Sequence, residues 1–156
     1  MNMQLNDARV MTADEAAKFV KSGDHVYVQG STSVPDMLLE AIARRHGELR
    51  DVTFYTGFSV SKGVAPICRP GMEESFFVDA FFVSNNVRQW IADGNGATTP
   101  RFLGDVPALF RKGYWPLDVV LLNCSMPDSH GYVSFGVGGD VACSAVECGK
   151  TLIAQI

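Results

Sequence analysis

The sequence predicts an α/β domain built on an open, mostly parallel sheet with helices on both faces. Strand-like and helix-like segments alternate along the chain, which is the pattern of such a sheet. Residues 117–124 (LDVVLLNC) form a nearly unbroken aliphatic run, typical of a parallel strand covered on both faces. The 156 residues, 47% hydrophobic and 19% charged, suit one globular domain with a core of its own.

The first half of the chain predicts several strand and helix units. Thr12 and Glu15 have the spacing of a capping box, so a short helix is expected over 12–21. Pro35 is expected as the first residue of a second helix, which runs to about residue 46. The other elements expected in this half are strands over 25–29 and 52–55, a strand within 75–83 and a helix over 85–92.

The second half continues this alternation and stops inside a strand. Its expected elements are a possible strand over 99–103, a helix over 106–112, strands over 117–124 and 132–135, a helix over 140–148 and a strand over 151–156. Natural domains usually finish with a polar tail or a docked helix, whereas the last apolar strand here has no polar residue after Gln155. The sequence therefore predicts that residues 1–156 are one domain of a truncated or processed protein.

Composition and charge argue against several classes of protein. The net charge of -4 and the lack of a basic stripe argue against a nucleic-acid partner. Residues 1–9 are polar and no apolar run reaches the roughly 18 residues of a membrane span, so neither a signal peptide nor a membrane anchor is expected. The four cysteines form no CxxC pair, which indicates reduced thiols in the cytoplasm and no metal site.

Two loops are expected at the carboxyl ends of strands, where open α/β sheets bind their ligands. In the first, residues 29–35 (QGSTSVP), Gly30 would let the backbone approach a ligand closely, and the N–H groups of the next helix start would favour an anion or a carbonyl oxygen. The alternative is an ordinary turn with serine capping. The loop has neither the GK[ST] of a phosphate-binding loop nor the GxGxxG of a dinucleotide site.

The second loop comprises residues 125–131 (SMPDSHG). His130 is a candidate general base with Asp128 as its orienting partner. The alternative is that both are turn formers whose side chains bind local backbone groups, as is common for Asp in a loop with Pro and Gly. Asp140, after two glycines, is expected at a helix start, where a carboxylate stabilises the helix dipole.

A series of short motifs runs along nearly the whole chain. They are VMTADEA at 10–16 with SGD at 22–24, VP at 34–35 with LLEA at 38–41, FV at 77–78, NVR at 86–88, PRFLGDVPALF at 100–110, PLDV at 116–119 and SMPDSHGYVSFG at 125–136. In this order the motifs resemble the amino-terminal half of acetyl-CoA hydrolase/transferase proteins, a group that includes 4-hydroxybutyrate, butyrate and acetate CoA-transferases.

The resemblance implies two similar open α/β domains with the active site between them. It also implies ping-pong acyl transfer through a glutamate carboxylate of the second domain, with coenzyme A as a substrate and no bound cofactor or metal. No glutamate here matches the family's catalytic motif, so no catalytic residue is assigned to this chain. The residues that the resemblance places beside the substrate are Gln29, Gly30, Ser31 and Pro35 from the first loop and Ser125, Asp128, His130 and Gly131 from the second.

The resemblance leaves the substrate and the reaction open. The QGSTS version of the first loop is closest to butyrate-type or 4-hydroxybutyrate-type enzymes. The expected partners are an acyl-CoA, a short carboxylate, the missing carboxyl-terminal domain and further copies of the same chain, since an unfinished sheet edge favours assembly. The alternatives are a stand-alone module that binds CoA or an acyl group without catalysis, an acetyl-CoA hydrolase, and a sugar-phosphate isomerase, for which a phosphate loop is not found.

Overall fold

The computed structural model describes residues 2–4, 8–60, 62–139 and 141–156. Among these residues, six strands form one sheet in the order β5-β4-β3-β2-β6-β8, and each neighbouring pair is parallel. The strands are β2 (His25–Val28), β3 (Val52–Thr56), β4 (Phe76–Ala80), β5 (Gly96–Thr98), β6 (Val119–Asn123) and β8 (Thr151–Gln155). The predicted open parallel sheet is confirmed.

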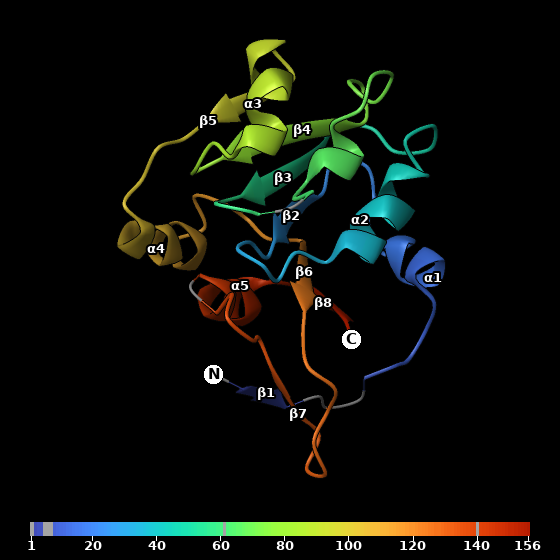
Figure 1. Ribbon diagram of the computed structural model, residues 1–156, viewed down its shortest axis with the longest axis vertical. Coiled ribbons are helices and arrows are strands. Elements are labelled where there is room, and N and C mark those ends of the chain that lie inside the picture. The colour runs from blue at the N-terminus through green and yellow to red at the C-terminus, as the bar shows by residue number, and fades with distance from the viewer. Residues whose placement is uncertain (1, 5–7, 61, 140) are drawn as a thin grey trace.

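Helices cover both faces of the sheet, as predicted, and Figure 1 shows α1 to α3 separated by the sheet from α4 and α5. The α-helices are α1 (Ala13–Ala17), α2 (Asp36–Ala43), α3 (Asn85–Ala92), α4 (Val106–Arg111) and α5 (Ala142–Cys148), with short 3-10 turns η1 (Ala65–Ile67) and η2 (Leu103–Asp105). The helices of each group contribute to a separate hydrophobic cluster. The two clusters are the cores above and below the sheet.

Side chains of the central strands alternate between these two cores. In β2, Val26 and Val28 pack with α1 and α2, whereas Tyr27 packs with α4 and α5. In the neighbouring β6, Leu121 and Leu122 divide in the same way. Because successive side chains of a strand point to opposite faces, a central strand with helices on both sides is apolar throughout.

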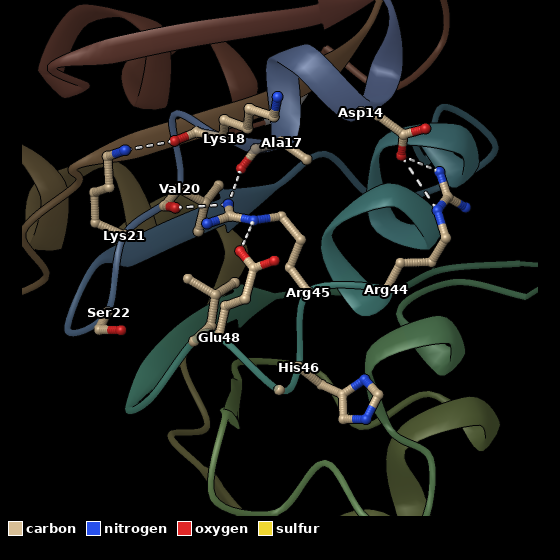
Figure 2. A network of polar contacts seen from close by, with 12 residues as sticks. Asp14, Ala17, Lys18, Val20, Lys21, Ser22, Arg44, Arg45, His46 and Glu48 are labelled. Atoms are coloured by element: carbon tan, nitrogen blue, oxygen red, sulfur yellow. Dashed lines mark hydrogen bonds and ion pairs between the residues drawn. The ribbon is translucent and has the colours of Figure 1, made fainter.

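Helix α1 is short and is held at both ends by side chains. Thr12 and Glu15 form the predicted capping box, in which the Glu15 amide donates to the Thr12 hydroxyl and the Glu15 carboxylate accepts from the Thr12 amide. At the other end, the Arg45 guanidinium donates to the carbonyl oxygens of Ala17 and Val20 (Figure 2). Arg45 thus gives the Ala17 carbonyl a second donor beside the Val20 amide, and it joins the end of α1 to the segment after α2.

A two-stranded antiparallel ribbon lies beside the main sheet. It consists of β1 (Asn2–Gln4) and β7 (Tyr132–Ser134), and Met3 faces Val133 in the register. The sequence predicted β7 but not β1, because residues 2–4 (NMQ) carry no alternating apolar pattern. Strand β1 is defined by a partner almost the whole chain length away. In Figure 1 the ribbon lies apart from β2 to β5.

Several element boundaries differ from the sequence prediction. Pro35 is the cap residue before α2 instead of its first helical residue. The strand expected over 99–103 is wrong: β5 lies just before it, at Gly96–Thr98, and the segment after it is a linker to η2. Asp140, expected at the start of α5, lies outside the described residues. In the part of the chain that is described, no helix has the length and apolar character needed to cross a membrane.

Candidate functional site

The loops that follow β2 and β3 are joined through their backbones. Ser31 and Ser59 form a parallel bridge; the Ser31 amide donates to the Phe58 carbonyl at 2.7 Å, and the Val60 amide donates to the Ser31 carbonyl at 3.1 Å. A Cβ atom at Gly30 would lie 2.6 Å from the Phe58 carbonyl oxygen. Gly30 is therefore required for the two loops to approach each other.

Ser31 holds an uncommon backbone conformation at this junction. Its φ angle is 59°, in the left-handed region that residues other than glycine rarely adopt. Such a conformation costs about 1–3 kcal/mol and persists when surrounding contacts fix it. The backbone hydrogen bonds of Ser31 with Phe58 and Val60 supply those contacts here.

A cavity of about 460 Å³ opens beside this junction, at the carboxyl ends of β2, β3 and β4. Its lining comes from four segments of the chain that lie far apart in the sequence. The lining residues are Tyr27, Gly30, Ser31, Gly57, Phe58, Phe81, Phe82, Arg101, Phe102 and Leu103. We call this the carboxyl-edge cavity. Its position agrees with the rule that open α/β sheets bind ligands outside the carboxyl ends of their strands.

The walls of the carboxyl-edge cavity are largely apolar and aromatic. Phe58 is 50% exposed, Phe82 is 52% exposed and Phe102 is 85% exposed, which is unusual for three phenylalanines on one rim. Phe58 and Phe82 pack edge to face with ring centroids 5.4 Å apart. Small-molecule sites are commonly lined in this way, by apolar side chains with a few polar groups among them.

A second cavity of about 490 Å³ adjoins the first, since Phe58 and Phe82 line both. Its remaining lining is largely polar and includes the start of α3. Ser84 accepts a hydrogen bond from the Ser59 amide at 2.9 Å, and Asn86 donates to the Ser59 hydroxyl at 3.0 Å. These bonds fix the loop after β3 against α3, and so fix the position of Phe58.

Of the first predicted loop, Gly30 and Ser31 line the carboxyl-edge cavity, whereas Gln29 and Pro35 are buried away from it. The Gln29 side chain is 0% exposed. Its amide nitrogen donates to the carbonyl oxygens of Phe135 and Gly138, both at 3.0 Å, and its oxygen accepts from the Asn123 amide at 2.8 Å. Gln29 therefore joins β2, β6 and the segment after β7.

The second predicted loop, residues 125–131, lines neither of these two cavities. The Asp128 carboxylate accepts hydrogen bonds from the amides of His130 and Tyr132, and the Ser125 hydroxyl accepts from the Ser134 amide. Gly131 has a φ angle of 79° and ends the turn. Asp128 thus binds local backbone groups, the turn-forming alternative, and the His130 side chain is exposed at the tip.

The two half-buried cysteines with perturbed acidity are poor nucleophiles. Burial raises the pKa of Cys124, at the carboxyl end of β6, to about 11 and the pKa of Cys68 to about 12. Both thiols are therefore protonated near neutral pH. The charge pair of Asp118 and Lys150, which lowers the pKa of Asp118, lies at the opposite, amino-terminal ends of the strands.

Sequence reasoning missed most of the cavity, since only Gly30 and Ser31 of its ten lining residues were predicted. Gly57, Phe81 and Phe82 follow β3 and β4 directly, and Arg101 lies in the linker after β5. A Cβ atom at Gly57 would lie 2.4 Å from the Phe81 ring, so this glycine allows the close approach of two neighbouring loops. The available signals were a glycine two residues after the predicted strand over 52–55 and the aromatic residues near the end of the segment 75–83.

The open parallel sheet carries a cavity at its carboxyl edge, the position at which open α/β domains commonly bind their ligands. Residues 4–156 match the model of the acetyl-CoA hydrolase/transferase N-terminal domain, and the chain belongs to this family. The chain is 30% identical, over 92% of its length, to a succinyl-CoA:acetate/propanoyl-CoA:succinate CoA transferase of Fasciola hepatica. It is 29% identical, over 95% of its length, to a 4-hydroxybutyrate coenzyme A transferase of Clostridium kluyveri.

Solved structures agree with this assignment. The chain superposes on RipA from Yersinia pestis with a TM-score of 0.81 and 25% identity, covering 92% of this chain and 35% of that one. It superposes on a 4-hydroxybutyrate CoA-transferase from Porphyromonas gingivalis with a TM-score of 0.73 and 29% identity, covering 94% of this chain and 32% of that one. The chain spans about a third of the length of these relatives.

Proposed function

We propose that this chain forms the acyl side of the active site of a CoA-transferase. The whole enzyme would move CoA between an acyl-CoA thioester and a short carboxylate such as 4-hydroxybutyrate, butyrate or acetate. The carboxyl-edge cavity, called the acyl-side cavity from here on, carries this proposal, because its walls are largely apolar and it lies where α/β domains bind ligands. The relatives named above support it, since each of the two curated ones is a CoA transferase.

The proposed reaction uses a glutamate of a second domain. Its carboxylate attacks the thioester carbonyl of the acyl-CoA, and the CoA thiolate leaves, which gives an acyl-glutamyl anhydride. The thiolate then attacks the glutamyl carbonyl, so the first acid is released as its carboxylate and a glutamyl-CoA thioester remains. The acceptor carboxylate repeats these steps in reverse, takes the CoA and regenerates the glutamate.

The described residues of this chain would bind the acyl group and limit the access of water. Phe58, Phe82 and Phe102 offer the apolar surface that a short acyl chain can cover. Ser31 brings a hydroxyl and a fixed backbone to the same wall. Exclusion of water matters here, because anhydride and thioester intermediates would otherwise be hydrolysed.

Two further features of the enzyme are part of this proposal. The outer strands β5 and β8 leave open sheet edges, which favours assembly with a second domain and further copies of the chain. The four cysteines are free, which supports a location in the reducing cytoplasm.

The test is an exchange assay on the full-length gene product. Butyryl-CoA and isotopically labelled acetate are expected to give labelled acetyl-CoA. The rate is expected to depend on the concentrations of both substrates. Residues 1–156 alone are expected to be inactive, and a carboxyl-terminal fragment with a reactive glutamate is expected to restore exchange.

Other outcomes would favour the alternatives. Release of free CoA at the same rate without a carboxylate acceptor would indicate an acetyl-CoA hydrolase. Tight binding of CoA to residues 1–156 alone, with no exchange by the full-length protein, would contradict the transferase proposal and indicate a binding module.

A further inference from the structure

The acyl-side cavity combines aromatic walls with one strongly basic side chain. Within its described lining, Arg101 is the residue that carries a full charge at neutral pH. Four phenylalanines and a leucine supply most of the remaining wall. A ligand that fits this lining has an apolar body and an anionic group.

Arg101 differs from most other arginines of the protein. The guanidinium groups of five arginines contact carboxylates, namely Arg44, Arg45, Arg50, Arg69 and Arg111. Within the described ranges, Arg101 has no carboxylate partner, and its recorded hydrogen bond is to the carbonyl oxygen of Pro100 at 3.0 Å. Arg101 is exposed, so its remaining N–H donors are accessible to a ligand in the cavity, since a guanidinium carries five.

The linker after β5 fixes where this charge lies. Between β5 and η2 the chain has no helix or strand, and Figure 1 shows this linker running from β5 toward α4. Phe102 and Leu103, the next two residues, also line the cavity. Val106, at the start of α4, is buried in the core and holds this end of the linker. Thr99 holds the other end, where its hydroxyl donates to Asp79 at 3.1 Å and its amide donates to the Ala80 carbonyl at 3.1 Å.

We infer that Arg101 binds the distal carboxylate of a dicarboxylic acyl group or acceptor, such as a succinyl group. This inference rests on the proposed function and deepens it by naming the substrate class. A carboxylate matches one guanidinium through two parallel N–H···O bonds, whereas sites for phosphate usually gather several donors. The apolar walls would cover the methylene groups between the two carboxyl carbons.

The experiment compares succinate with butyrate as CoA acceptors for the full-length protein. Both acids have four carbons, and they differ by the distal carboxylate. We expect kcat/KM for succinate to exceed that for butyrate by about tenfold or more, since a charge-assisted bidentate pair contributes on the order of 1.5–3 kcal/mol. In Arg101→Gln we expect the value for succinate to fall about 10- to 100-fold and the value for butyrate to stay within about twofold.

Two further variants control for charge and folding. Arg111→Gln removes the same charge from α4, where Arg111 pairs with Glu147, and should leave both kcat/KM values unchanged. Arg101→Lys should recover part of the preference, because it restores a cation without the bidentate geometry. Arg101 is exposed, so Arg101→Gln should keep the unfolding midpoint of the wild type.

Three results would overturn the inference. One is an equal fall in kcat/KM for both acids in Arg101→Gln, which would indicate that Arg101 binds a phosphate of CoA. Another is an unchanged preference in that variant, and the third is a wild type that does not prefer succinate. If the wild type transfers CoA to no acid, the proposed function fails, and the inference is then judged by titrating residues 1–156 with succinyl-CoA and with butyryl-CoA, which differ by one free carboxylate. A shift of the Arg101 Nε–H resonance that is larger with succinyl-CoA would support the inference, and equal shifts or no shift would contradict it.

Discussion

The loops after β2 and β6 leave neighbouring strands at the same edge of the sheet, yet they are built in different ways. The loop after β2 is bridged to the loop after β3 through Ser31 and Ser59, and both border the acyl-side cavity. The loop after β6 folds on itself, because Asp128 accepts hydrogen bonds from two amides of its own turn. Location at the carboxyl edge is therefore not enough to make a cavity; adjacent loops must also meet there.

Gln29 joins these two regions, so its loss should have the largest effect on stability. Gln29→Leu would leave the Phe135 and Gly138 carbonyl groups and the Asn123 amide without their present partner. We expect the free energy of unfolding to fall by about 2–4 kcal/mol, because each buried group left unsatisfied costs about 1–3 kcal/mol. Chemical denaturation measures this change.

The matched control is Gln89→Leu on the exposed face of α3, where we expect a change within about 0.5 kcal/mol. If both variants lose equally little free energy of unfolding, Gln29 does not hold the loops after β2 and β6 together. In that case Gln29 would be free to serve as the substrate-binding residue that the sequence resemblance implies.

Gly30→Ala should separate the two loops that border the cavity. The new Cβ atom would lie 2.6 Å from the Phe58 carbonyl oxygen, and a backbone atom cannot move away as easily as the end of a side chain. We expect a loss of about 1–3 kcal/mol in the free energy of unfolding, together with weaker transfer of CoA. Denaturation and the exchange assay measure the two effects.

Gly47→Ala is the control for this change, since no atom lies within 4 Å of a Cβ atom at Gly47. Its stability and activity should match those of the wild type or exceed them slightly. Wild-type behaviour of Gly30→Ala would show that the close approach of the two loops is not needed.

Asp128→Ala should affect the second loop alone. The two hydrogen bonds that the Asp128 carboxylate accepts from backbone amides lie in an exposed turn. Their loss should lower the free energy of unfolding by about 0.5–1.5 kcal/mol. The kcat for CoA exchange should stay close to that of the wild type. A large fall in kcat with little loss of stability would contradict this and make Asp128 the orienting residue of a catalytic His130.

Ser31→Gly gives the smallest expected change in stability. Glycine relieves the strain of a φ angle of 59° but adds freedom to the unfolded chain, so we expect a net gain of about 0.5 kcal/mol or less. Activity should fall, because the cavity loses a hydroxyl and a fixed wall. Thermal unfolding and the exchange assay, run on the same samples, separate the two effects.

Asp51→Gly is the matched control, because Asp51 is exposed and has a φ angle of 55° away from the cavity. It should show a similar gain in stability and full activity. Equal activity in both variants would mean that Ser31 has no part in binding the substrate.

The sequence predicted the sheet because its strands are apolar runs bounded by turn residues. It also predicted Gly30, since a glycine directly after a strand is a local signal. It could not predict that Gly30 faces Phe58, or that Arg101 lies beside both, because these contacts depend on the strand order β5-β4-β3-β2. Strand β1 was missed for the same reason, since its partner β7 lies more than a hundred residues away.

The central claim is that the acyl group lies in the cavity beside Gly30. The most direct test records amide chemical shifts of residues 1–156 with butyryl-CoA and with CoA at matched millimolar concentrations. Shifts at Gly30, Gly57 and Phe82 that are larger with butyryl-CoA than with CoA would support the claim. Shifts confined to residues 125–131, or no difference between the two ligands at the cavity, would contradict it.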